Sequence, residues 1–460
     1  MYLLRSLEAR AAAGNPIRVG LIGAGKFGSM FLSQARRTVG VHLVAVADLS
    51  PARAKASLLH TGWNEDRLTA NSFADAKKGG TTYLHDSADD MIAADEIEVV
   101  IDATGNPALG IHHVLQCCKH GKHMVMVNVE ADALAGPLLA EKARSAGIVY
   151  SLAYGDQPAL ICEQVEWARG AGFDVVAAGK GTKYLPAYHA STPDTVWQHY
   201  GLSAEDAAKG GMNAQMFNSF LDGTKSGIEM AAVANATGLT PAPNGLEFPA
   251  CSVDELAQLL KPKSAGGQLH HPGQVEVISS MSRNGQPIPR DLRWGVYVTF
   301  AAGSEYVRRC FKEYGLVTDD SGEYSSMYKP FHLIGLELGL SVAHAAIRNE
   351  PTGQAQDFIG DVVATAKRDL KVGETLDGEG GFTVWGKLMP ATDSLRLGGL
   401  PIGLAHHLKL VRPVAMGAPV TWTDVAFDAT MPAIQFRRAM EDSYRHKLGV
   451  ERLAAKVAVG

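Results

Sequence analysis

The chain has 460 residues, enough for two or three domains of roughly 150 residues each. Hydrophobic residues make up 46% of it and charged residues 20%, which is typical of a soluble globular protein. The formal net charge of -5 argues against nucleic acid or an anionic membrane surface as a partner, because binding to either depends on a broad basic surface. We therefore expect a globular protein whose ligand is a small molecule.

The cysteines and the N-terminus bear on location. An odd number of cysteines without CxxC or Cys/His metal spacing predicts free thiols in a reducing compartment. The first sixteen residues predict a short amphipathic helix and lack the features of a secretory signal. The sequence contains no run of about 18 apolar residues, so we expect no membrane span. We expect a cytoplasmic location. The cysteines are Cys117, Cys118, Cys162, Cys251 and Cys310.

A glycine-rich stretch follows the first predicted strand, Ile17 to Ile22. Gly23, Gly25 and Gly28 have the GxGxxG spacing, and an apolar helical pattern begins directly after them. Such a loop gives a tight turn, a close backbone approach to a pyrophosphate and close packing of helix on strand. The sequence therefore predicts a dinucleotide site that includes Gly23, Ala24, Gly25, Lys26, Phe27 and Gly28.

A second predicted strand ends at Asp48, where a dinucleotide fold places the carboxylate that binds the ribose hydroxyls. A carboxylate at this position repels the 2′-phosphate of NADP, so we expect NAD as the cofactor and NADP as the less favoured one. Arg53 lies one helical turn further and could pair with such a phosphate. An unliganded α/β turn is the alternative for the whole stretch.

Strands and helices alternate up to residue 156, which predicts a doubly wound parallel sheet of the Rossmann type. We expect residues 61–93 to be a polar, helical insertion, and the stretch KHMVMVNVEAD to be a strand followed by a helix from Pro137 to Ala146. Because parallel strands present their carboxyl ends to the ligand, the residues that follow these ends are candidates for the cofactor site. They are Thr104, Gly105, Asn106, Asn128, Glu130 and Gly155, with an ordinary turn as the alternative for residues 104–107.

The pattern changes after residue 156. A strand, FDVVAAG, leads into a predicted glycine-bounded loop with Lys180 and Lys183, and apolar helices follow, one of which carries Glu229. Residues 238–289 are rich in proline and glycine and are typical of a lid or binding loop. Short β-branched runs after Glu350 predict a small, mostly β module that ends in a helix.

Several motifs together resemble one family. In chain order they are GAGKFG, IDATGNP, MVNVEAD, YGDQP, GKGTK, EMAAVANATGL and YKPFHLIGLE, followed by KRDLKVGETL and LPIGLA. They resemble homoserine dehydrogenase-like oxidoreductases with a C-terminal SAF domain, and within these the DXR-like reductoisomerases, which use NADPH on 1-deoxy-D-xylulose 5-phosphate. The resemblance covers nearly the whole chain and implies a homo-oligomer. An NADPH enzyme is expected to have neutral or basic residues after its second strand, and the carboxylate of Asp48 differs from that pattern.

These observations predict an α/β enzyme of three domains: a dinucleotide-binding domain (1–156), an α+β substrate and oligomerisation domain (157–350) and an SAF-like domain with the final helix (351–460). Hydride transfer needs a group that moves the hydroxyl proton, and a lysine in a dry, cation-rich pocket can do this. Lys180 is the first candidate and Lys183 the second, with a solvated loop lysine as the alternative for each. Asp156 and Glu130 could orient the lysine or bind substrate, while Asp156 could equally cap a helix.

The paired histidines do not form a metal site by adjacency and no HExxH motif occurs, so we expect no metal ligands, although a divalent ion bound jointly with substrate stays open. We expect an NAD(P)-dependent oxidoreductase acting on a small polar hydroxy or keto compound that carries phosphate or carboxylate. The alternatives are a redox-neutral isomerase or lyase that retains NAD(P), and a non-catalytic dinucleotide sensor.

Overall fold

A computed structural model describes residues 3–451 of the chain. These residues form two compact units, the first from residues 3–163 and 332–356 and the second from residues 164–331 and 357–451. This division differs from the predicted boundaries, because residues 332–350 belong with the dinucleotide-binding part and residues 357–451 with the middle of the chain. The assignment of three functional domains stays a prediction.

The first unit is built on a six-stranded sheet in the order β3-β2-β1-β4-β5-β6, in which every neighbouring pair is parallel. This is the predicted Rossmann-type α/β fold, which is thereby confirmed. Its elements are α1 (Leu3–Ala12), β1 (Ile17–Ile22), α2 (Lys26–Ala35), β2 (Val41–Ala47), α3 (Pro51–His60), η1 (Glu65–Leu68), α4 (Phe73–Gly79), β3 (Tyr83–His85), α5 (Ala88–Ala93), β4 (Val99–Asp102), α6 (Pro107–His120), β5 (His123–Met126), α7 (Val129–Ser145), β6 (Tyr150–Leu152), α15 (Gly339–Ala343) and the π turn η4 (His344–Arg348).

Two local predictions in this unit are wrong. Residues 61–93 are not only a helical insertion, because Tyr83–His85 form the edge strand β3, which pairs with β2. The stretch that begins KHMVMVNVEAD leaves the strand after Met126, and α7 starts at Val129 rather than at Pro137. The Asn128 side chain caps α7 by accepting a hydrogen bond from the Ala131 amide, which explains the early start.

Residues 332–356 return to the first unit because their apolar side chains complete its core. Leu338, Val342 and Ala343 are buried in the cluster that also contains the β1 and α2 side chains. Gly335 packs so closely on α2 that a Cβ there would lie 2.6 Å from the Cβ of Met30. The segment is therefore an integral part of the first unit.

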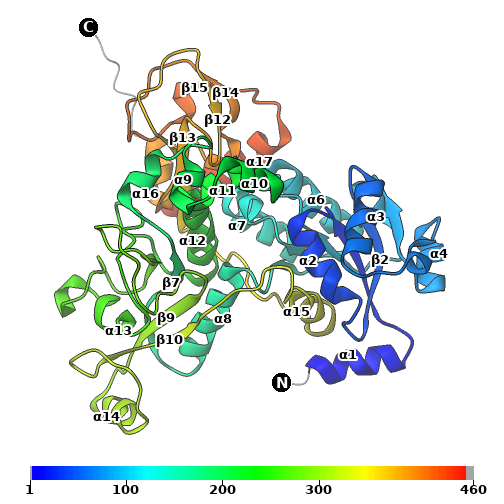
Figure 1. Ribbon diagram of the computed structural model, residues 1–460, viewed down its shortest axis with the longest axis horizontal. Helices are drawn as coiled ribbons and strands as arrows, with labels where there is room; N and C mark the ends of the chain where they lie inside the picture. The colour runs from blue at the N-terminus through cyan, green and yellow to red at the C-terminus, as the bar shows by residue number, and fades with distance from the viewer. Residues whose placement is uncertain (1–2, 452–460) are drawn as a thin grey trace. The chain divides into compact units, whose positions relative to one another are not determined.

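The second unit contains a four-stranded mixed sheet in the order β10-β9-β7-β8. Figure 1 labels three of its strands, β7, β9 and β10. The helix α12 packs on β7 and β8 and also contacts β11 and β13 of the C-terminal part. It is nearly all buried, so it forms the centre of this unit. The elements up to residue 331 are β7 (Asp174–Thr182), η2 (Pro186–Ala190), α9 (Val196–Tyr200), α10 (Ala204–Lys209), α11 (Ala214–Leu221), α12 (Thr224–Thr237), α13 (Leu256–Leu259), η3 (Lys263–Ala265), β8 (Gln274–Ser279), β9 (Val296–Ala301), α14 (Glu305–Glu313) and β10 (Tyr324–Lys329), while α8 (Gln157–Gly170) runs from the first unit into the second.

The C-terminal part carries two small sheets, β11-β13 and β12-β14-β15, whose strand pairs are all antiparallel. This agrees with the mostly β module expected after residue 350. Its elements are β11 (Gly360–Ala366), β12 (Thr375–Asp377), β13 (Val384–Pro390), α16 (Ala391–Leu397), η5 (Ile402–Leu404), β14 (His406–Leu410), η6 (Trp422–Asp424), β15 (Val425–Ala426) and α17 (Pro432–Leu448).

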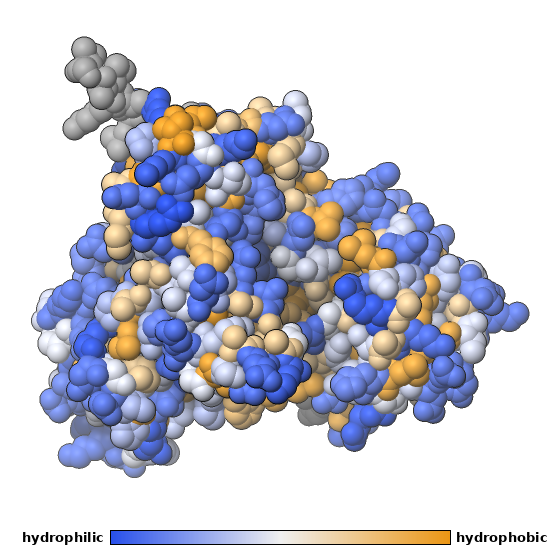
Figure 2. Space-filling view, turned by 45° about the horizontal axis from the view of Figure 1, so that its top comes forward, coloured by the Kyte–Doolittle hydropathy of each residue, from blue (hydrophilic) through white to orange (hydrophobic). Residues whose placement is uncertain are grey.

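Hydrophilic side chains dominate the face shown in Figure 2, and the hydrophobic ones appear in small separate groups. Within residues 3–451, no helix combines the length and apolar character that a membrane crossing requires.

Candidate functional site

The glycine loop between β1 and α2 has the geometry that its sequence predicts. Gly23 has a φ of +90°, which favours glycine, and a Cβ at Gly28 would lie 2.2 Å from the Gly23 carbonyl oxygen. A Cβ at Gly25 would meet nothing within 4 Å, so the loop is open at this point. Gly25 precedes α2 without a side-chain cap, so the first amides of this ten-residue helix can take an anion such as a pyrophosphate.

Asp48 follows β2 directly and joins the loop to the next helix. Its carboxylate accepts hydrogen bonds from the Ala24 amide at 2.9 Å and the Ser50 amide at 2.9 Å. The Arg53 guanidinium lies 2.7 Å from the same carboxylate, and the Arg53 side chain is 62% exposed. Asp48 therefore holds the loop in place and keeps about one acceptor position for a ligand, since a carboxylate offers about four.

A cavity of about 520 Å³ opens at the carboxyl ends of β1, β2 and β4. Ligands of open parallel sheets bind at this edge, and the residues fit a dinucleotide: uncapped amides for the pyrophosphate and a carboxylate for the ribose. Of the predicted cofactor residues it brings together Gly23, Gly25, Asp48, Thr104 and Asn106, and Arg53 joins them. Its lining does not include Ala24, Lys26, Phe27, Gly28, Gly105, Asn128, Glu130 or Gly155.

The strand end of β4 is organised by Asp102. This fully buried carboxylate accepts from the Thr104 hydroxyl at 2.7 Å and lies 2.8 Å from Nδ1 of His113. The Asn128 amide donates to the Asn106 carbonyl at 2.7 Å, so Asn128 positions the 104–106 turn from behind. Asp102 and His113 were not among the candidates taken from the sequence. The sequence feature that could have revealed Asp102 is its place as the last residue of the predicted strand in IDATGNP.

Glu130 and Asp132 do not end a strand, as the sequence had suggested, but lie in the first turn of α7. The Asp132 carboxyl is fully buried and accepts one hydrogen bond, from the Tyr150 hydroxyl at 2.8 Å. Burial raises the pKa of Asp132 to about 7, although the bond from Tyr150 opposes this rise. Asp132 is therefore a buried carboxyl of α7 whose partner is Tyr150 of β6.

Gly155 and Asp156 follow β6 and face residues 332–356. Gly155 has a φ of +94°, and a Cβ there would lie 2.7 Å from the Leu333 carbonyl oxygen, so the glycine is needed for close packing. Asp156 is 5% exposed and accepts from the Gln157 amide at 2.8 Å, at the start of α8. The Leu160 amide donates to the Asp156 carbonyl, which places Asp156 directly before the first turn of α8, and the catalytic assignment of Asp156 stays a prediction.

The predicted loop around Lys180 is wrong. Lys180 lies inside β7, where it pairs with Val277 of β8 and Val296 of β9. Its ammonium forms a buried ion pair with the Glu229 carboxylate of α12, and the two side chains are 8% and 6% exposed. Glu229, which lies on an otherwise small and apolar helix, is thus buried with a lysine as its partner.

Lys183 lies just beyond β7 in a half-buried cluster with Tyr200 and Arg293. Its ammonium donates to the His199 carbonyl, and the Lys183 and Arg293 cations lie 5.7 and 6.0 Å from the Tyr200 ring centroid. Burial, and secondarily the charge of Arg293, lower the pKa of Lys183. Within residues 3–451 neither cation forms an ion pair with a carboxylate, so this cluster is suited to an anion.

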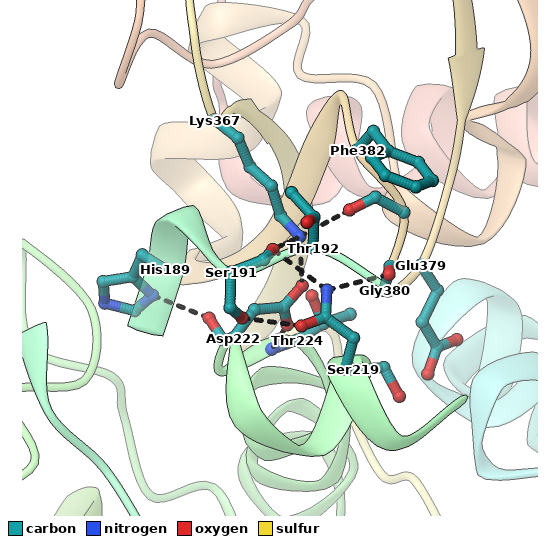
Figure 3. A network of polar contacts seen from close by, with 12 residues as sticks. His189, Ser191, Thr192, Ser219, Asp222, Thr224, Lys367, Glu379, Gly380 and Phe382 are labelled. Atoms are coloured by element: carbon teal, nitrogen blue, oxygen red, sulfur yellow. Dashed lines mark hydrogen bonds and ion pairs between the residues drawn. The ribbon is translucent and has the colours of Figure 1, made fainter. Parts of the chain in front are cut away.

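A buried network around Lys367 was missed by the sequence reasoning (Figure 3). The Lys367 ammonium lies 2.8 Å from the Asp222 carboxylate and donates to the carbonyls of Ser191 and Gly381 at 2.8 and 2.7 Å. The network thus fixes the loop after β12 to the segment that precedes α12. Lys367 belongs to the quoted motif KRDLKVGETL, but its partner is 145 residues away, so local pattern could not reveal the pair.

His189 borders the same network. Its Nδ1 lies 2.7 Å from the Asp222 carbonyl oxygen and its Nε2 lies 2.9 Å from the Tyr184 hydroxyl, while the ring stacks on Trp385 with centroids 3.9 Å apart. Burial lowers the pKa of His189 to about 4, which keeps the imidazole neutral near pH 7. Nδ1 must carry the proton, because a carbonyl can only accept, so Nε2 accepts from Tyr184.

Among residues 3–451, no three histidine, cysteine, aspartate or glutamate side chains come close enough together to hold a metal ion. The five cysteines are all free thiols.

Two families match successive parts of the chain. Residues 19–152 match the NAD-binding domain of homoserine dehydrogenase, and residues 155–338 match the catalytic domain of oxidoreductase DRL. A search of curated proteins gave no match. The chain is thus similar to NAD-binding oxidoreductases in two successive segments, and Asp156, Lys180 and Lys183 all lie in the segment that matches the catalytic domain.

Solved structures with partial likeness include an NAD-binding oxidoreductase from Klebsiella pneumoniae, with 20% identity, a TM-score of 0.26 and coverage of 38% of this chain and 47% of that one. A myo-inositol dehydrogenase from Corynebacterium glutamicum has 13% identity, a TM-score of 0.27 and coverages of 39% and 48%. An oxidoreductase from Agrobacterium radiobacter has 15% identity, a TM-score of 0.27 and coverages of 36% and 44%. The match spans about half the length of each solved chain.

Proposed function

We propose that this oxidoreductase transfers hydride between NAD(H) and a small polar hydroxy or keto compound that carries a phosphate or carboxylate. The observation that carries the proposal is the cavity of about 520 Å³ formed by the glycine loop, Asp48 and the 104–106 turn. It offers a dinucleotide the uncapped amides of α2 for its pyrophosphate and a carboxylate for its ribose. The bound nicotinamide would supply the hydride chemistry.

We favour NAD over NADP because Asp48 is nearly buried at the ribose position. A buried carboxylate close to a 2′-phosphate is unfavourable, since two like charges meet away from water. Arg53 acts in the opposite direction, because its exposed guanidinium could swing from Asp48 to a phosphate. The preference therefore depends on which of these two side chains faces the ribose.

We assign different roles to the two lysines of the catalytic segment. Lys180, held in place by the Glu229 carboxylate, is the candidate for moving the hydroxyl proton, because its ammonium can donate a proton to the alkoxide that forms when a keto substrate is reduced. Lys183 and Arg293 have no carboxylate partner among residues 3–451 and are the candidates for binding the anionic group of the substrate. Asp156 and Glu130 remain candidates for orienting the lysine or binding substrate hydroxyls.

A DXR-like, redox-neutral reductoisomerase or lyase that retains NAD(P) is the second candidate, supported by the sequence resemblance and opposed by Asp48. An SAF identity for residues 357–451, a homo-oligomeric assembly and a reducing, cytoplasmic location also belong to the proposal; the five free thiols support the location. A non-catalytic sensor is the third alternative.

The test is turnover of a panel of sugar acids and sugar phosphates with NAD(H) and NADP(H), followed by nicotinamide absorbance and by product analysis. Lys180→Met is expected to abolish the hydride step, whereas Lys183→Met and Arg293→Gln are expected to raise KM more than they lower kcat. Turnover without net change in nicotinamide, in protein purified with its cofactor, would favour the isomerase. Full activity in both lysine variants would overturn the assigned roles.

A further inference from the structure

A second cavity lies at the opposite end of the nucleotide-binding sheet. It has a volume of about 820 Å³ and is formed where β2 begins, where α2 and α4 end and where the chain leaves α3. The cofactor cavity is at the carboxyl ends of β1 and β2, so the two are separated by the length of a six-residue strand, about 20 Å. This second cavity belongs to residues 14–80, which include the polar stretch after α3 that the dinucleotide site does not use.

The second cavity is strongly basic although the chain as a whole is acidic. Arg36, Arg67, Lys77 and Lys78 line it together with His42, and none of the residues described along it is aspartate or glutamate. Among residues 3–451, none of these four permanent cations forms an ion pair. Burial, and secondarily the charges of Arg67 and Arg18, lower the pKa of His42, which agrees with a positive local field.

The shape of the cavity depends on close backbone approaches. The Arg36 guanidinium lies against Gly62, where a Cβ would be 3.1 Å from its Nη2, and Gly62 has a φ of +87°. The Trp63 indole donates to the Leu32 carbonyl at 2.9 Å and packs on the core of the first unit, so one wall is rigid. His42 lies 2.8 Å from the Thr81 carbonyl oxygen, which fixes the ring at the floor.

We propose that this cavity binds a small, multiply charged phosphorylated anion, separately from the cofactor site. Four unpaired cations match the charge of a phosphomonoester or pyrophosphate better than that of a single carboxylate, and guanidinium groups bind phosphate oxygens in pairs. The simpler explanation is that cations at helix ends only balance the negative helix dipole. Arg36 and Arg37 both follow α2, yet only Arg36 lines the cavity, so comparison of these two neighbours separates the explanations.

The experiment is calorimetric titration of the full-length protein with pyrophosphate at low ionic strength, after saturation with NADH so that the glycine loop is occupied. We expect one saturable site. The double variant Arg36→Gln/Arg67→Gln is expected to weaken pyrophosphate binding at least about tenfold, because each charged hydrogen bond contributes substantially. Arg37→Gln is the matched control and should leave binding unchanged, and unchanged NADH affinity in all variants shows that the nucleotide-binding unit is folded.

Three results would overturn the proposal. One is the lack of saturable pyrophosphate binding in the unmodified protein. Another is an equal loss of binding in Arg37→Gln and in the double variant, which is the behaviour of a general surface charge effect. The third is equally tight binding of citrate, which would show a site for polyanions in general. Each result is independent of whether the oxidoreductase reaction is as proposed.

Discussion

The buried ion pair between Lys180 and Glu229 predicts a large effect from a small change. Both side chains are less than a tenth exposed, so Glu229→Gln leaves a lysine charge in the interior without its partner. Loss of one member of such a pair costs about 3–5 kcal/mol. We expect hydrogen exchange of the α12 amides to become roughly two to four orders of magnitude faster, since each 1.36 kcal/mol is a factor of about ten.

Two comparisons isolate this effect. Glu205→Gln breaks the exposed pair with Lys209, whose side chains are 78% and 69% exposed, and should change stability by about 0.5 kcal/mol or less. The double variant Lys180→Met/Glu229→Leu removes both charges and should regain most of the lost protection. Unchanged exchange of the α12 amides in Glu229→Gln would refute the reasoning. So would a loss of stability in the double variant equal to the sum of the losses in Lys180→Met and Glu229→Leu alone.

Three further predictions concern other parts of the molecule. Gly28→Ala places a Cβ 2.2 Å from the Gly23 carbonyl oxygen, so it should abolish NADH binding in a calorimetric titration; retained affinity would contradict the close packing. The pKa of Asp132 is raised to about 7 in the fold, so its contribution to stability is complete at acid pH and is lost as pH rises from about 4 through about 7. The protection of the α7 amides, measured relative to their intrinsic exchange rate at each pH, should fall over this range, and Asp132→Asn should remove that fall. Lys367→Met leaves Asp222 buried without its cation and should destabilise the loop after β12, seen as proteolysis near residue 380, whereas an unaltered digestion pattern would argue against the network.

The dinucleotide-binding half could be predicted from the sequence because its signals are local. The glycine spacing and the acid at the end of the second strand, Asp48, are each read from residues a few positions apart, and the structure has both the tight glycine loop and the carboxylate beside it. The edge strand β3 was missed because it has only three residues, all half-buried, in a polar stretch. A strand of this length carries no readable alternation.

The catalytic segment was harder to predict because its order comes from distant contacts. Gly179 and Gly181 flank Lys180 and are typical of a loop, but here they allow neighbouring backbone to approach the strand. A Cβ would lie 1.8 Å from the Glu276 carbonyl oxygen at Gly179 and 1.9 Å from the Leu292 carbonyl oxygen at Gly181. Sequence alone could not distinguish these two uses of glycine.

The most direct test of the account is calorimetric titration of the cofactor-stripped protein with NADH and NADPH, in the unmodified chain and in Asp48→Asn and Arg53→Gln. The carboxamide keeps an acceptor for the Ala24 amide but removes the charge. We predict that NADH binds more tightly, that Asp48→Asn loses the preference and that Arg53→Gln keeps it. Tighter binding of NADPH would show that Arg53 contacts the 2′-phosphate and that Asp48 does not select the ribose hydroxyls. Failure of both cofactors to bind would contradict the dinucleotide site itself.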